Sequence, residues 1–141
     1  MSQTSQYPCS PRTEIDGVVY FPRLCDKIRL NTAGKLGEEY LGNLGNGMDL
    51  WTCQYLGVNY ADLADLVEGG ATDSEALAWA RNHGLDRPAH EFAWWSAYMK
   101  TRGFRDDLAA KLEQRKAESG FQDRADIQSF MDYIDADEGR I

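Results

Sequence analysis

The sequence is poor in the residues that usually carry metal or redox chemistry, with 2 His and 3 Cys among 141 residues. Cys9, Cys25 and Cys53 show no C-x-x-C or Cys/His zinc spacing, and their odd number excludes a disulfide framework that uses all of them. Free thiols mostly behave as small buried apolar side chains. We therefore expect no metal and no cofactor, and a reducing, cytoplasmic compartment.

Long apolar runs and positive charge are also lacking. No segment reaches the roughly 18 apolar residues of a membrane span, and the first residues contain neither a basic region nor an apolar run. We expect neither a membrane nor a secretory route. The chain has 15 Lys and Arg against 23 Asp and Glu, a formal net charge of -8. Because attraction to phosphate polymers requires a positive field, nucleic acid is not an expected partner.

What remains is the composition of a globular domain, with 43% hydrophobic and 27% charged residues. A chain of 141 residues can build a core without a metal or a disulfide. Residues 1–11 are polar and contain two prolines, which predicts a flexible or surface-laid N-terminal arm. We predict a single helical domain over residues 12–141.

Glycines, prolines and capping residues divide most of this domain into about seven short helices. The predicted helices span about 22–32, 49–57, 59–69, 72–84, 88–103, 106–119 and 123–138. Asp49 is the expected cap of the second of these helices. The one extended segment predicted is 17–21, before Pro22 at the first helical position. The fold class is mainly α: a single compact multi-helix bundle with an extended N-terminal arm.

The helix predicted over 88–103 carries apolar side chains on two faces. Phe92, Trp95 and Met99 point in one direction, and Trp94 and Tyr98 point in another. A helix of this kind usually lies in the middle of a bundle. The alternative is that one aromatic pair lines a ligand pocket.

Three resemblances to known motifs do not hold. The loop Gly42–Gly47 lacks the Gly-Lys-Ser/Thr ending of a phosphate-binding loop, and Asp49 stands where a helix N-terminus should meet the anion. His90 is followed by glutamate, but the second histidine of a zinc-protease motif is absent. The acidic run Asp135–Gly139 has its glycine at the wrong position for a calcium loop.

A basic cluster stands out near the N-terminus of this acidic chain. Its members are Arg12, Arg23, Lys27, Arg29 and Lys35. Arg23 and Lys27 are four residues apart and share a helix face, while Asp26 is three residues before Arg29 and can pair with it. One interpretation is a solvated face with intramolecular salt bridges. The other is a small anion site, in which an arginine fork and a lysine converge on a carboxylate or phosphate and Tyr20 and Tyr40 add hydroxyl donors.

A second unusual feature is a group of carboxylates at the C-terminal end of the last predicted helix. Its members are Asp132, Asp135, Asp137 and Glu138. The helix dipole disfavours negative charge at this end. One interpretation is a solvated tail, and the other is an ion pair with the basic N-terminal region.

Short motifs in this order resemble those of a bacterial family catalogued as domain of unknown function 5069. They are Ser10–Arg12, Phe21–Arg23, Asp26–Arg29, Gly34–Leu36 and Leu56–Val58. The resemblance extends from about Pro11 to Gly139 and implies a bacterial, stand-alone protein. It also implies that the Pro-Arg and Asp-Lys-Ile-Arg residues belong to the family pattern, whereas the cysteines and histidines do not.

Three functions are compatible with these patterns. The first is a binding module that holds an anionic small molecule, or an acidic segment of a partner, on Arg12, Tyr20, Arg23, Asp26, Lys27, Arg29 and Lys35. The second is a protein-interaction or assembly domain, such as a homodimer, with an exposed apolar patch that includes Trp51, Trp79 or Trp94. The third and least supported is an enzyme that uses Asp26, Asp49 or Cys25.

Overall fold

The computed structural model describes residues 6–141, and the first regular element in them is a short β-hairpin. Its strands are β1 (Glu14–Ile15) and β2 (Val18–Val19), paired antiparallel with Glu14 opposite Val19. The turn residues Asp16 and Gly17 both have positive φ, 49° and 83°, as Asp-Gly does in two-residue hairpin turns. The extended segment predicted at 17–21 is shorter than expected, because Tyr20 (φ 73°) turns the chain into the first helix.

Helices make up most of the rest of residues 6–141, so the mainly α prediction is confirmed. They are α1 (Phe21–Thr32), α2 (Glu38–Leu41), α3 (Met48–Leu56), α4 (Tyr60–Glu68), α5 (Asp73–His83), α6 (Ala89–Thr101), α7 (Ala109–Glu118) and α8 (Phe130–Asp137). Helix α2 was not predicted, because four residues are too few for a helical apolar period to be visible.

Local signals account for several helix starts. Pro22 lies in the first turn of α1, where its missing N–H leaves no hydrogen bond unmade. The Asn59 side chain accepts a hydrogen bond from the Ala61 N–H (2.8 Å) and caps α4. Thr72 and Glu75 form a reciprocal capping box at the start of α5.

One predicted cap and one predicted helix start were wrong. Asp49 does not cap α3, because the cap position is occupied by Gly47 and the Asp49 carboxylate is used inside the protein. The last helix begins at Phe130 instead of near Asp123, because Ser129 caps it by accepting a hydrogen bond from the Asp132 N–H (3.2 Å).

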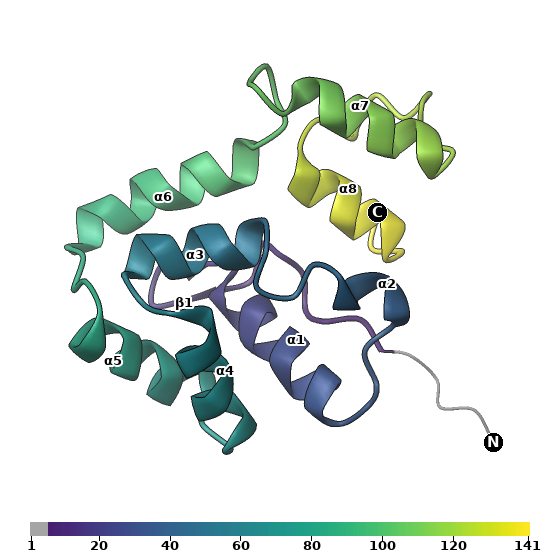
Figure 1. Ribbon diagram of the computed structural model, residues 1–141. Coiled ribbons are helices and arrows are strands. Elements are labelled where there is room, and N and C mark those ends of the chain that lie inside the picture. The colour runs from purple at the N-terminus through teal and green to yellow at the C-terminus, as the bar shows by residue number, and fades with distance from the viewer. Residues whose placement is uncertain (1–5) are drawn as a thin grey trace.

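Two apolar clusters stabilise this arrangement. The larger cluster contains buried side chains of β2, α1 and α3–α6, with Met131 of α8. The smaller cluster joins α7, α8 and the loop between them through Leu112, Ile127 and Ala136. In Figure 1, α6 reaches from the side of α5 toward α7 and α8. The C-terminal pair of helices is therefore a small unit with its own core, placed against a larger one.

Helix α6 is only partly the central helix that its sequence predicted. Phe92, Trp95 and Met99 are buried in the larger cluster. Trp94 and Tyr98 are 68% and 49% exposed, so the second apolar face is on the surface and not in the core.

The N-terminal arm is described in part. Residues 1–5, which the prediction included, lie outside the described residues. Within 6–11 the chain lies against the body, since the Cys9 N–H donates to the Asp26 carboxylate (3.1 Å) and Pro11 is buried.

Candidate ligand-binding cleft

A cleft of about 460 Å³ lies between the larger unit and the C-terminal helices. Residues of α1, α2 and α3 line one side of the cleft, and residues of α7 and α8 line the other. The lining residues of α8 extend from Phe130 to Asp137, so the cleft runs along the whole helix. Figure 1 shows this helix between α7 and α2. The volume of the cleft is within the range of small-molecule sites, which is about 300–1,000 Å³.

Three predicted site residues lie together in the wall of this cleft: Tyr20, Arg23 and Lys27. Arg23 and Lys27 are one helical turn apart on α1 and therefore face the same way. All three are buried. Two buried cations beside a cleft require internal partners, because an unpaired charge away from water is very unfavourable.

Lys27 is paired with Asp49. Its ammonium lies 3.0 Å from each carboxylate oxygen of Asp49. The Tyr20 hydroxyl (2.6 Å) and the Gly45 N–H (3.0 Å) donate to the same carboxylate. Burial raises the pKa of Tyr20 well above its ordinary value, and the negative charge of Asp49 adds to this effect. Burial lowers the pKa of Lys27, and Asp49 opposes that shift.

Arg23 is paired with Glu138 through two parallel hydrogen bonds of 2.8 and 2.7 Å. The Tyr40 hydroxyl also donates to Glu138 (2.6 Å), and Arg140 approaches the same carboxylate. Burial opposes ionisation of Glu138, but hydrogen bonding and the charge of Arg23 outweigh it and lower the pKa of Glu138. Arg23 Nη1, one of the two nitrogens that bind Glu138, also donates to the Cys9 carbonyl (3.1 Å). The buried Arg23 Nε has no hydrogen-bond partner among the described residues.

The remaining walls combine apolar surface with charges at the margins. Met48, Trp51 and Phe130 provide apolar contacts. Lys111 of α7 is exposed and has no ion-pair partner within residues 6–141. Asp137 of α8 lies at the α2 side, where burial raises its pKa and the nearby charges of Glu138 and Glu39 add to the shift.

The other predicted site residues lie elsewhere. Arg12 pairs with Asp132 (2.5 Å) and Asp135 (2.9 Å), on the part of α8 that does not line the cleft. Lys35 is exposed after α1, and its backbone carbonyl accepts from Gln6 (2.9 Å). Neither residue lines the cleft.

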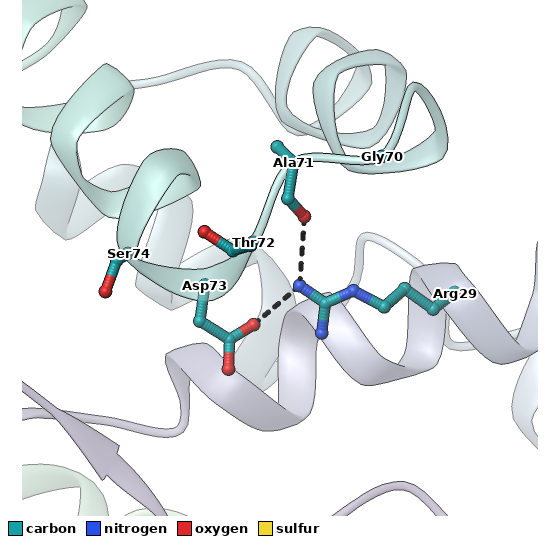
Figure 2. A pocket seen from close by; sticks show the side chains of 6 residues that line it. All are labelled: Arg29, Gly70, Ala71, Thr72, Asp73 and Ser74. Carbon is teal, nitrogen blue, oxygen red and sulfur yellow. Dashed lines mark hydrogen bonds and ion pairs between the residues drawn. The ribbon is translucent and has the colours of Figure 1, made fainter.

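Arg29 and Asp26 form a separate structural link between α1 and the start of α5. The Arg29 guanidinium donates to Asp73 (2.7 Å) and to the Ala71 carbonyl (3.2 Å), as Figure 2 shows. It also pairs with Asp26 at 3.2 Å. The shallow, open hollow around it is lined by short side chains and backbone of residues 70–74. Arg29 is thus occupied in joining two helices.

The candidate catalytic residues are not placed as reactive groups. Asp49 is fully buried and accepts four hydrogen bonds. Burial raises the pKa of Cys25 far above its ordinary value, so its thiol stays protonated. Asp26 accepts from Cys9 and Arg29.

Two further observations concern other classes of site. Within residues 6–141, no three His, Cys, Asp or Glu side chains are grouped so that they could hold a metal ion. None of the helices described is both long and apolar enough to cross a membrane.

Sequence reasoning missed the partners that complete the cleft. Asp49 was interpreted as a helix cap or as a candidate enzyme carboxylate, and Lys111 and Trp51 were not associated with the basic cluster. No local signal connects these residues to α1, because each lies in a different element and reaches the cleft through tertiary packing.

Comparison with protein-family models identifies the family of this chain. A family model described as Domain of unknown function (DUF5069) matches residues 5–140. The match includes every residue that lines the cleft. No curated protein matches the chain.

Proposed function

The chain belongs to the DUF5069 family, and we propose that it is a binding module that holds a small anionic molecule in the cleft between α1–α3 and α7–α8. The observation that carries this proposal is the placement of buried Arg23 and Lys27 side by side in the wall of a cleft of about 460 Å³. Buried ionisable groups in a cleft mark candidate functional sites, because their burial has a large desolvation cost.

Charge in the cleft decides how an anion can bind. Arg23 and Lys27 are already neutralised by Glu138 and Asp49, so they add no net attraction. Lys111 is the cation at the margin that lacks an ion-pair partner within residues 6–141. We therefore expect Lys111 to attract the anion at the entrance, and the buried donors to bind it inside.

The apolar part of the wall supports a ligand with an apolar body. Met48, Trp51 and Phe130 line the cleft together with the polar groups. Small-molecule sites typically combine such surface with a few placed hydrogen-bond donors. A small anion with an attached apolar group fits this combination better than an inorganic ion.

Thermal melting against a panel of anions tests the proposal. The panel contains inorganic phosphate, nucleotides and small mono- and dicarboxylates, with divalent metals included for comparison. A ligand at about a hundred times its dissociation constant adds roughly 2.7 kcal/mol of stability, which is several degrees for a domain of this size. Lys111→Ala should reduce the shift, whereas Lys35→Ala, which removes the same charge outside the cleft, should not. A flat panel would contradict the proposal.

A protein-interaction role is the second candidate, and the outer face of α6 supports it. Trp94 and Tyr98 are one helical turn apart and strongly exposed. Exposed aromatic groups of this kind favour contact with another protein or a second copy of the chain. Sedimentation over a range of concentrations tests this role, and Trp94→Ala with Tyr98→Ala should abolish any self-association that is found.

We also propose that the protein works in a bacterial cytoplasm. Cys9, Cys25 and Cys53 are free thiols, and a reducing compartment maintains cysteines in that state. The bacterial part of the proposal comes from the family resemblance.

A further inference from the structure

The Glu138 carboxylate lies where a ligand carboxylate would bind. Both of its oxygens accept from the Arg23 fork at 2.8 and 2.7 Å, and the Tyr40 hydroxyl adds a third donor at 2.6 Å. A fork of two parallel N–H donors is specific for a planar group with two oxygens. Arg23, Tyr40 and Glu138 all line the cleft, so this arrangement belongs to its wall.

The internal carboxylate does not fully satisfy Arg23. The side chain is 3% exposed, and its Nε has no acceptor among the described residues. A buried donor without a partner destabilises the folded protein, because it has lost its hydrogen bonds to water and gained none in return. The pairing with Glu138 therefore leaves one donor of the Arg23 guanidinium without a partner among the described residues.

The segment that carries Glu138 is short and lies at the edge of the unit. Helix α8 ends at Asp137, and Gly139 (φ 79°) reverses the chain immediately afterwards. Residues 139–141 are exposed. Helix α8 itself is held by Met131 in the larger core and by Arg12 on its side. The Arg140 side chain also holds this end, through Asp135 (3.1 Å), Glu138 and the Pro8 carbonyl. Release of Glu138 from Arg23 therefore requires a local change at residues 138–141 that also frees Arg140, while α8 remains in place.

We propose that the ligand of the cleft is a small carboxylate with an apolar body, which replaces Glu138 on Arg23 and Tyr40. Glu138 is then an internal competitor that occupies the fork when the ligand is absent. Met48 and Trp51 contact the body of the ligand. This inference rests on the proposed anion-binding function and specifies its ligand class and its regulation.

Calorimetric titration tests the ligand class with three probes: acetate, 3-phenylpropionate and inorganic phosphate. We expect 3-phenylpropionate to bind more tightly than acetate because of the apolar wall, and phosphate to bind most weakly. Glu138→Gln should increase the affinity for 3-phenylpropionate about tenfold, since a neutral amide competes poorly for a guanidinium. Tyr40→Phe should weaken it several-fold. Tyr40→Phe leaves both buried charges in place, so it remains informative if Glu138→Gln fails to fold.

Amide hydrogen exchange in the wild-type protein tests the displacement. With Glu138 on Arg23, the Gly139 N–H donates to the Ala136 backbone carbonyl (3.1 Å) and the Arg140 N–H donates to the Asp135 backbone carbonyl (2.7 Å). Saturation with 3-phenylpropionate should speed exchange at residues 138–141 and slow it around Met48.

The outcomes separate the two proposals. Binding of phosphate alone, or binding of 3-phenylpropionate with slower exchange at 138–141, would overturn the carboxylate replacement and leave the anion-binding function standing. Binding of none of the probes, together with a flat melting panel, would overturn both.

Discussion

Arg23 and Glu138 are 115 residues apart in the sequence, yet their side chains form two parallel hydrogen bonds in the interior, where they are 3% and 2% exposed. This pair joins α1 to the end of α8. It therefore connects the larger unit to the C-terminal helices at the same place where the cleft opens between them.

Loss of one partner of this pair should be strongly destabilising. Glu138→Gln leaves the Arg23 guanidinium buried without a counter-charge, which typically costs about 3–5 kcal/mol. Glu118→Gln, which removes the partner of Arg115 in an exposed pair, should cost less than about 1 kcal/mol. Urea unfolding of the two variants measures the difference. Equal costs would show that the buried pair does not hold the units together.

The same pair should make stability depend on pH in the acid range. The pKa of Glu138 is lowered in the folded protein below its ordinary value of 4.5. The contribution of Glu138 to the free energy of unfolding is therefore fully present above pH values near that ordinary pKa. It is lost as the pH falls through the lowered pKa of the folded protein. The free energy of unfolding should fall less steeply in Glu138→Gln than in the wild type between neutral pH and pH 3. Glu68→Gln, on the exposed surface of α4, should leave the profile unchanged.

Asp135 and Asp137 provide a matched pair of substitutions with opposite expected signs. Asp135 accepts from Ser10 (3.1 Å), Arg12 (2.9 Å) and Arg140 (3.1 Å), so Asp135→Asn should destabilise by about 1–3 kcal/mol. Burial, together with the nearby charges of Glu138 and Glu39, raises the pKa of Asp137 and disfavours its charged form, so Asp137→Asn should stabilise the protein at neutral pH.

Salt distinguishes the cause of these two effects. Arg12 is 39% exposed, so its attraction to Asp135 is open to screening. Added salt should reduce the cost of Asp135→Asn in thermal melts. The gain of Asp137→Asn should change less, because it comes mainly from burial of the carboxylate. Equal melting temperatures for both variants and the wild type would contradict the assignment of partners at the end of α8.

The Tyr20 hydroxyl should contribute measurably to the Lys27–Asp49 pair. It donates to Asp49 at 2.6 Å, and hydrogen bonds to charged groups contribute about 1.5–3 kcal/mol. Tyr20→Phe should lower the free energy of unfolding by that amount while preserving the shape of the core. Tyr7→Phe, at an exposed tyrosine of the arm, serves as the control. A loss no greater than that of the control would show that Asp49 is satisfied without Tyr20.

Much of the fold was predictable from local chemistry. Pro22, Asn59 and the Thr72–Glu75 capping box lie where the helices begin, because their preferences concern backbone groups within a few residues. The start of α8 was misplaced because Ser129 is the true cap and earlier residues resemble one. The exposure of Trp94 was one of two alternatives that the sequence left open, because an apolar side chain does not reveal whether another element covers it.

The sequence predicted the basic residues of the candidate site but not the acidic partners that they bind. The four-residue spacing of Arg23 and Lys27 correctly places them on one face of α1. Their partners, Asp49 and Glu138, lie 22 and 115 residues away and meet them only after the helices have packed. The carboxylates of α8 were open to two interpretations in the sequence, and pairing of Asp135 and Glu138 with Arg12 and Arg23 is the one observed.

Amide chemical-shift mapping tests the central claim most directly. The uniformly labelled protein is titrated with the anion that gives the largest melting shift. We predict that the changes concentrate at Gly47, Met48 and the Trp51 indole, which line the cleft. Changes centred on residues 70–74, beside Arg29, or on the exposed face of α6 at Trp94, would contradict the account and place the binding surface elsewhere.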